Sequence, residues 1–250
     1  MKNAVLTKRY TLIDLLRGLA VIAMIVYHTM WDLVYVHGLA LGNWADRPLS
    51  RVIFQASIRW SFVLLSGFCF QLGKHHLKRG LTVLGGGVII TLVTMVVMGE
   101  YAIHLGVLTF LGSAMLLTIP VHWLFRRIPG WVGFPVCLLL FLIVEHIAGG
   151  FIGLGSWHVA VPLSWYANYF TAWLGLPALS FSSADYVPIL PWIFAFWMGY
   201  FAFSMFKKWN WLPALSCIRF EPLEWVGRNA LLIYMLHQPV VYGVLYLIFM

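Results

Sequence analysis

Seven long apolar segments dominate the sequence and restrict the folds that it can adopt. They cover residues 12–35, 52–72, 81–98, 102–124, 131–148, 188–206 and 227–249. Each approaches or exceeds the ~20 residues that an α-helix needs to cross a bilayer. Of the 250 residues only 10% are charged, against ~25% in soluble chains. The sequence therefore predicts an all-α, polytopic bundle of at least seven transmembrane helices, with residues 1–250 forming a single domain.

The basic residues are distributed unevenly between the two sides of such a bundle. Among the 16 Lys and Arg residues, the opposite side holds only Arg47, Arg51 and Arg59. The majority side carries Lys2, Lys8, Arg9, Arg17, Lys74, Lys78, Arg79, Arg126, Arg127, Lys207, Lys208, Arg219 and Arg228. Because cytoplasmic loops are enriched in Lys and Arg, we expect a cytoplasmic N-terminus and an outer C-terminus in the cell (inner) membrane. The net charge of +8 is then a topology signal among membrane lipids, and no nucleic-acid partner is expected.

The first apolar segment carries a narrow polar stripe. In a helix with about 100° per residue, Asp14, Arg17, His28 and Asp32 fall within about 60° of arc. The stripe is about 27 Å long, close to the thickness of the hydrocarbon core. Ionisable side chains in membranes are costly, and they usually face a bundle interior or a wet cavity. The stripe therefore either packs the helix into a bundle or belongs to a functional site.

His28 and Asp32 form the part of the stripe that best suits chemistry. They are four residues apart on one face, so a contact between carboxylate and imidazole is available. Such a contact would fix the tautomer of His28, and imidazole is the commonest general base. Arg59 falls in the same outer half of the bilayer. It could pair with Asp32 or hold an anionic group such as a carboxylate or phosphate.

The last apolar segment holds a second polar group. Tyr234, His237 and Gln238 share one helix face, where they could line a cavity or form interhelical hydrogen bonds. Before the sixth segment, Asp185 could cap the helix that also contains Trp192, or lie at the mouth of the same cavity. The three cysteines show neither disulfide nor metal-ligand spacing, so no metal site is expected.

Two further stretches have a less specific meaning. The run Gly85-Gly86-Gly87 lacks the Lys-Ser/Thr of a nucleotide loop, and it more simply permits close helix packing. The connection 149–187 contains no Lys or Arg and is rich in Trp, Tyr, Gly and Pro. It could anchor at the membrane interface, act as a substrate-binding lid, or contain one or two further helices.

The polar motifs together resemble a known family. The stretch Asp14-Leu15-Leu16-Arg17-Gly18-Leu19-Ala20, followed by Tyr27-His28 and Trp31-Asp32-Leu33, resembles the opening of the DUF1624 family, which shares its domain with heparan-α-glucosaminide N-acetyltransferase. Similar later motifs follow in the same order: Leu105-Gly106-Val107-Leu108, Asp185-Tyr186 with Pro191-Trp192, and Gly227-Arg228 with Tyr234 and His237-Gln238-Pro239. The spacing from Arg17 to His28 is also similar to that of the acyltransferase-3 family of membrane O-acyltransferases.

The resemblance implies a reaction and a set of roles. An acyl group, acetyl in the heparan enzyme, would pass from cytoplasmic acyl-CoA, a co-substrate, to a hydroxyl or amine of a glycan, sugar or small-molecule acceptor at the outer side. No bound cofactor is implied. His28 would act as general base or transient acyl carrier, and Asp32 would orient it. Donor and substrate contacts would come from Arg17, Asp14, Arg59, Tyr234, His237, Gln238, Asp185 and Trp192.

The sequence also departs from the family pattern. In the heparan enzyme the position of His28 is asparagine, and the catalytic histidine lies in the loop after the first span. This chain has His37 in a similar place, but it lacks the surrounding His-Ala-x-Trp pattern of the family. Thr109 stands where the third motif usually has histidine. The glycosaminoglycan specificity is therefore not carried over, and His28, His37 and His237 remain alternatives for the catalytic histidine.

A different class of function fits the same stripe. A proton-coupled transporter or lipid flippase could use the Asp, His and Arg side chains as a relay. The sequence shows no pair of symmetric, interrupted helices of the kind that transporters often have. The oligomeric state stays open, a homodimer included.

Overall fold

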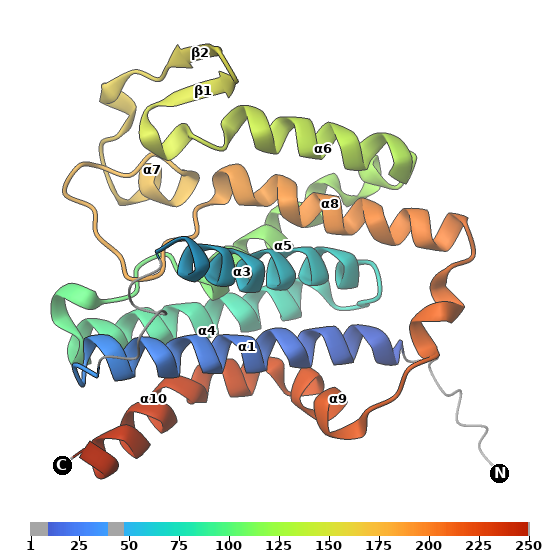
Figure 1. Ribbon diagram of the computed structural model, residues 1–250. Helices are drawn as coiled ribbons and strands as arrows, with labels where there is room; N and C mark the ends of the chain where they lie inside the picture. Colours follow the sequence, from blue (N-terminus) through green and yellow to red (C-terminus); the bar gives the residue numbers. More distant parts are fainter. Residues whose placement is uncertain (1–9, 40–47, 250) are drawn as a thin grey trace. The chain divides into compact units, whose positions relative to one another are not determined.

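The computed structural model describes residues 10–39 and 48–249, and most of these residues are helical (Figure 1). The long helices are α1 (Thr11–Tyr35), α3 (Pro48–Phe70), α4 (His76–Val97), α5 (Val107–Phe125), α6 (Gly130–Val144), α8 (Ile189–Lys208) and α10 (Ala230–Phe249). Within this described part, seven helices are long and apolar enough to cross a membrane, the fifth continuing to Gly149. The prediction of an all-α polytopic bundle is confirmed, and the chain is a multi-pass membrane protein.

The sidedness of the chain stays a prediction. Four of the basic residues on which it rests, Lys2, Lys8, Arg9 and Arg47, lie outside the described residues.

Short elements join the long helices: η1 (Gly99–Tyr101), η2 (Ile147–Gly149), β1 (Phe151–Leu154), β2 (Trp157–Ala160), η3 (Leu163–Trp165), α7 (Tyr169–Leu174), η4 (Leu212–Ser216) and α9 (Glu221–Arg228).

The contacts divide the chain into two compact units, which are described separately. The first unit comprises residues 1–62 and 206–250, and the second comprises residues 63–205. The boundary falls within α3. The prediction of a single domain over residues 1–250 stays a prediction.

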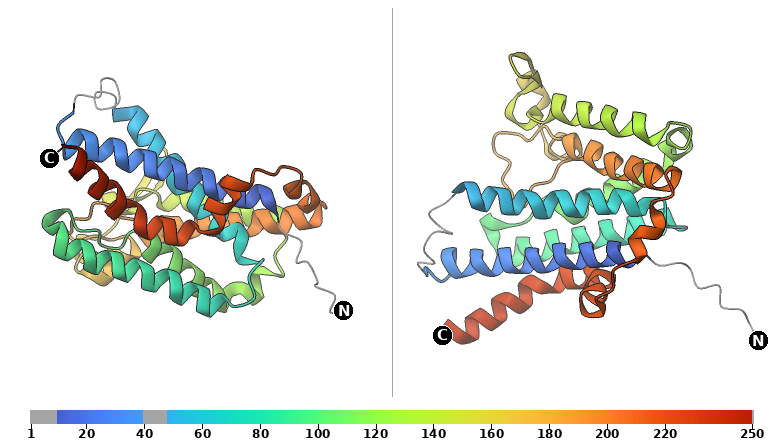
Figure 2. Two further views of the ribbon diagram at one scale, coloured as in Figure 1. Left: turned by 90° about the horizontal axis from the view of Figure 1, so that it is seen from below. Right: turned by 45° about the vertical axis from the view of Figure 1, so that its right-hand side comes forward.

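In the first unit, α9 and α10 pack on α1. Two glycines allow the backbones of α1 and α9 to touch: a Cβ at Gly18 would lie 2.2 Å from the carbonyl oxygen of Leu223, and one at Gly227 would lie 1.9 Å from that of Asp14. These contacts make α9 antiparallel to α1. The chain then turns, and α10 runs in the same direction as α1 (Figure 2). Side chains of α10 therefore face the polar stripe of α1.

In the second unit, α4 and α5 form a close antiparallel pair. A Cβ at Gly87 would meet the backbone nitrogen of Thr109 at 2.5 Å, and one at Gly112 would meet that of Leu84 at 2.4 Å. The predicted packing role of the glycine run is therefore confirmed at Gly87. A Cβ at Gly85, by contrast, would meet no atom within 4 Å and would face open space.

The connection between α6 and α8 contains structure that the sequence patterns did not reveal. β1 and β2 form an antiparallel hairpin with Phe151 opposite Ala160. The one α-helix that the connection adds among the described residues, α7, has 6 residues and is too short to cross a membrane. Asn168 accepts hydrogen bonds from the first backbone N–H groups of α7 in a capping box. The interfacial anchor and the substrate lid both stay open as functions of this connection.

Candidate active site

The centre of the candidate site is a pair of histidines from two helices. Nδ1 of His28 in α1 lies 2.7 Å from Nε2 of His237 in α10, and the two rings stack with their centroids 4.9 Å apart. Both side chains are half-buried. The structure thus brings together two residues that are 209 positions apart in the chain, each of which the sequence had singled out on its own helix.

A backbone carbonyl sets the tautomers of this pair. Nδ1 of His237 lies 2.6 Å from the carbonyl oxygen of Tyr234. Since a carbonyl can only accept, Nδ1 of His237 carries the proton. An ionised ring within a membrane span is costly, so His237 is neutral and its Nε2 accepts from Nδ1–H of His28. A neutral His28 then has its lone pair on its other ring nitrogen, Nε2, for which the described residues provide no hydrogen-bond partner.

Asp32 has a different partner from the one expected. Its side chain is buried, with 2% of its surface exposed. Nε2 of Gln238 donates to Oδ1 at 3.1 Å and to Oδ2 at 2.9 Å. The expected contact between Asp32 and His28 does not occur among the described residues, because α10 presents the neighbouring residues His237 and Gln238 to the stripe. A buried carboxylate needs such a donor, so this pair stabilises the contact between the two helices.

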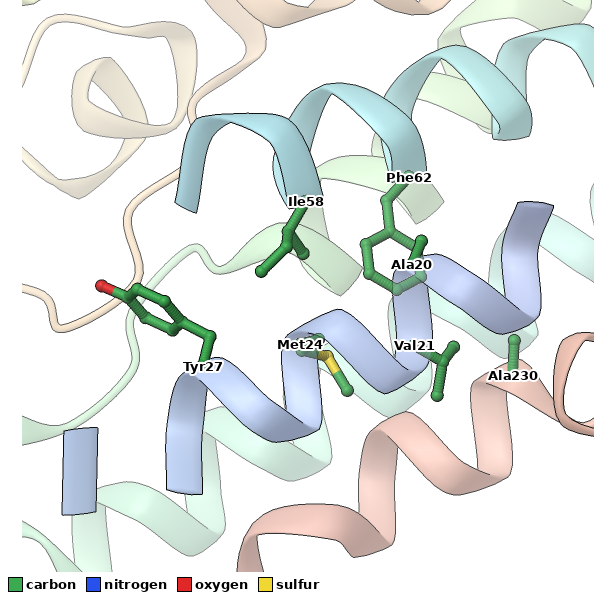
Figure 3. Close-up of a cluster of buried hydrophobic side chains, with 7 residues drawn as sticks. All are labelled: Ala20, Val21, Met24, Tyr27, Ile58, Phe62 and Ala230. Carbon is green, nitrogen blue, oxygen red and sulfur yellow. The ribbon is translucent and has the colours of Figure 1, made fainter. Parts of the chain in front are cut away.

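An apolar cluster holds the histidine pair in place. Ala20, Val21, Met24 and Tyr27 of α1 pack with Ile58 and Phe62 of α3 and Ala230 of α10. Figure 3 shows Ile58 and Phe62 pointing from α3 toward α1. Tyr27 contacts the ring of His28 edge-on at 5.7 Å, and Phe62 contacts Tyr234 in the same manner at 6.0 Å. The side chains on each side of the histidine pair are thereby restrained.

Two polar atoms near Asp32 lack partners within the described part of the chain. They are Oε1 of Gln238 and Nε2 of His37, and both are buried. His37 follows the end of α1, where its backbone N–H donates to the carbonyl of Asp32 at 3.1 Å. Its ring packs on Phe249 with centroids 4.8 Å apart. His37 therefore lies past the end of α1 and is not a member of the histidine pair, which consists of His28 and His237.

Asp14 and Arg17 form an ion pair at the other end of α1. Nη1 of Arg17 lies 3.1 Å from Oδ1 of Asp14 and donates to the carbonyl of Gly227 at 3.5 Å. The side chain of Arg17 is 26% exposed. This ion pair joins α1 to the close contact with α9. A structural role is therefore visible, and the predicted contact with an acyl donor stays a prediction.

Arg59, Asp185 and Trp192 contribute to the structure in different places. Arg59 lies on the part of α3 that belongs to the first unit. Asp185 and Trp192 belong to the second unit. There Oδ2 of Asp185 accepts from the backbone N–H of Val107 at 3.3 Å. Asp185 thus caps the start of α5, whereas the sequence suggested a cap on the following helix.

The surroundings of Asp185 and Trp192 are well packed. The next residue, Tyr186, donates to the carbonyl of Ala172, and burial raises the pKa of its phenol. The ring of Trp192 meets that of Phe141 edge-on, with the ring centroids 5.5 Å apart.

Among residues 10–39 and 48–249, no group of three or more His, Cys, Asp or Glu side chains is arranged to hold a metal ion.

The pairing of His28 with His237 was the relationship that sequence reasoning missed. Both residues stood out as histidines within apolar spans. A further signal was available, because each histidine has a second polar residue close to it on the same helix: Asp32 comes four residues after His28, and Gln238 comes one residue after His237. Two helices that each carry two polar residues within an apolar span are candidates to pair them with each other.

Comparison with known protein families shows the family of the chain. The family described as heparan-alpha-glucosaminide N-acetyltransferase, catalytic, matches residues 9–239. The matched range includes both histidines of the pair and the Asp32–Gln238 contact. No curated protein and no solved structure matches the chain.

Proposed function

The chain belongs to the heparan-α-glucosaminide N-acetyltransferase catalytic-domain family, and on this premise we propose that it transfers an acetyl group from acetyl-CoA to an acceptor. The family is of the membrane acetyltransferase type. We propose further that the donor is cytoplasmic, that the acceptor is a hydroxyl or amine of a sugar or glycan at the outer side, and that the chain resides in the cell membrane.

One observation carries the catalytic part of this proposal. The 2.7 Å contact between His28 and His237, with Tyr234 behind it, directs the lone pair of His28 to Nε2. This is the arrangement that a general base needs, since the ring is held in one orientation and one tautomer. Acceptor binding beside Nε2 would complete the hydrogen bonding of His28.

The proposed transfer needs only the two substrates and this lone pair. Nε2 of His28 takes the proton of the acceptor O–H or N–H while the acceptor atom attacks the thioester carbonyl carbon. The tetrahedral intermediate then collapses, the carbon–sulfur bond breaks, and the imidazolium returns the proton to the CoA thiolate. While His28 is charged, its hydrogen bond to His237 becomes charge-assisted and therefore stronger.

A covalent route would use the same atom. Nε2 of His28 would attack the thioester, release CoA and carry the acetyl group until the acceptor takes it. The two routes differ kinetically, because the covalent route releases CoA before the acceptor binds. Arg17, one-quarter exposed and already near Asp14, is proposed to contact the donor.

The function is tested with the purified chain in lipid nanodiscs and radiolabelled acetyl-CoA. Free thiol from released CoA and label in the product are measured together, with glucosamine and other sugars as acceptors. We expect acceptor-dependent CoA release with one acetyl group transferred per thiol formed. Proton or substrate flux across proteoliposomes without consumption of acetyl-CoA would contradict the proposal and support the transporter alternative.

A further inference from the structure

A second cluster of titratable side chains lies in the unit of residues 63–205. His76 begins α4 and His122 lies in the last turn of α5. Their ring centroids are 5.7 Å apart. Phe70 stacks on His76 at 4.2 Å and meets His122 edge-on at 5.6 Å. The two imidazoles therefore contact the same phenyl ring, that of Phe70.

Hydrogen bonds hold one side of this cluster and leave the other side unsatisfied. The hydroxyl of Tyr200 lies 2.9 Å from Nδ1 of His122. Gln71 donates to the carbonyl of Tyr200 at 2.9 Å and to the hydroxyl of Ser204 at 2.7 Å. In contrast, Nδ1 of His76 is buried and has no partner in the part of the chain that the structure describes. A buried polar atom without a partner is uncommon in folded proteins and calls for a ligand, a water or an ion.

Two arginines add positive charge to the same cluster. Arg79 follows His76 by one turn and lies beside Phe70, His76 and Met115. Arg126 likewise follows His122 by one turn, and its backbone N–H donates to the carbonyl of His122 at the end of α5. The acidic residues of this unit are Glu100, Glu145 and Asp185. Glu100 follows the end of α4, whereas His76 lies at its start. Asp185 caps the start of α5, whereas His122 lies at its end. Glu145 follows the end of α6, whose start comes soon after Arg126 in the chain.

We propose that His76, Arg79, His122 and Arg126 form a binding site for a phosphate ester. Four groups that can carry positive charge lie here, and no carboxylate among the described residues of this unit lies with them, so an anion would relieve their mutual repulsion. A phosphate offers several acceptor oxygens to guanidinium N–H groups, whose fork geometry fits it. It also gives the orphaned Nδ1 of His76 an acceptor or donor. The phosphate ester would come from a nucleotide-type molecule such as coenzyme A or from a phospholipid headgroup.

The site is tested by direct binding, independently of any acetyl transfer. The full-length chain is placed in nanodiscs of phosphatidylcholine, and binding of coenzyme A and of inorganic pyrophosphate is measured by calorimetry. A parallel arm measures thermal stabilisation in nanodiscs that contain phosphatidylglycerol. Binding of pyrophosphate, or binding of coenzyme A that depends on Arg79 and Arg126, identifies a free phosphate ester. Stabilisation by phosphatidylglycerol alone identifies a headgroup.

Matched variants separate a site from general positive charge. We expect Arg79→Gln and Arg126→Gln each to weaken the effect by about tenfold, the loss of one charge-assisted hydrogen bond. Arg127→Gln removes the same charge at the same helix end, but the guanidinium of Arg127 lies over the ring of Trp123 at 3.8 Å; it should bind like the wild type. Absence of both effects in the wild type, or equal losses in all three variants, would overturn the proposal.

Discussion

Nδ1 of His28 and Nε2 of His237 are 2.7 Å apart, and the carbonyl of Tyr234 holds the far side of His237. The three groups form a continuous chain from a backbone acceptor to the nitrogen that we assign as base. Asp32, which sequence reasoning had placed behind His28, instead pairs with Gln238. We therefore assign the orientation of the base to the imidazole of His237 and not to the carboxylate of Asp32.

Replacing His237 should lower the turnover of acetyl transfer without abolishing acceptor binding. His237→Ala removes the acceptor for Nδ1–H of His28, including the bond that strengthens when His28 is charged. Such a bond is worth about 1.5–3 kcal/mol, so kcat should fall about tenfold or more. The measurement is steady-state CoA release, with kcat and KM determined separately.

A conservative variant distinguishes positioning from packing at this residue. In His237→Gln the side-chain amide oxygen reaches about as far as Nε2 and can still accept from His28. This variant should therefore retain more activity than His237→Ala. Equal kcat values for the two variants would show that the hydrogen bond contributes nothing to the reaction.

The contact between Asp32 and Gln238 should matter chiefly for stability. Gln238→Leu leaves a buried carboxylate, 2% exposed, without its donor, and the free energy of unfolding should fall by about 1–3 kcal/mol or more. Asp32→Asn retains an oxygen that can accept from Gln238 and should cost less. Thermal unfolding in nanodiscs compares the stability of the two variants. A larger loss of stability for Asp32→Asn than for Gln238→Leu would refute the assigned pairing.

Gly227 should be intolerant of a side chain because α1 and α9 touch there. A Cβ would lie 1.9 Å from the backbone oxygen of Asp14, so the backbones must separate, at a cost of about 1–3 kcal/mol. Gly243, within α10, is the matched control: no atom lies within 4 Å of its Cβ position. Gly243→Ala should raise stability by about 0.5–1 kcal/mol through helix propensity. Similar thermal shifts for both variants would rule out the close contact.

Much of the fold could be predicted because each long helix consists of an apolar run bounded by polar or glycine-rich residues. The seven segments reappear as helices with bounds that differ at the ends, where caps and 3₁₀ turns decide the last residues. The hairpin at Phe151–Ala160 was not predictable in the same way. Its strands have four residues each, too few for a clear alternation of polar and apolar positions.

The candidate site could be predicted in its residues but not in its pairing. His28, Asp32, His237 and Gln238 are polar residues within apolar spans, which is a signal that a single sequence provides. Which of them touch depends on the direction and register of α10 against α1. The contacts of Gly18 and Gly227 fix the register of α9 against α1, and α10 follows α9 after a turn at Asn229. A helix period alone contains neither of these relationships.

The central claim is that His28 is the base for acetyl transfer, and one comparison tests it most directly. Acceptor-dependent release of CoA is measured for the wild type, for His28→Ala and for His146→Ala, whose histidine is exposed beyond the end of α6. Because general-base catalysis contributes about 10²–10⁴-fold, His28→Ala should lose at least about a hundredfold in kcat while His146→Ala stays near the wild type. Full acetyl transfer by folded His28→Ala would contradict the account.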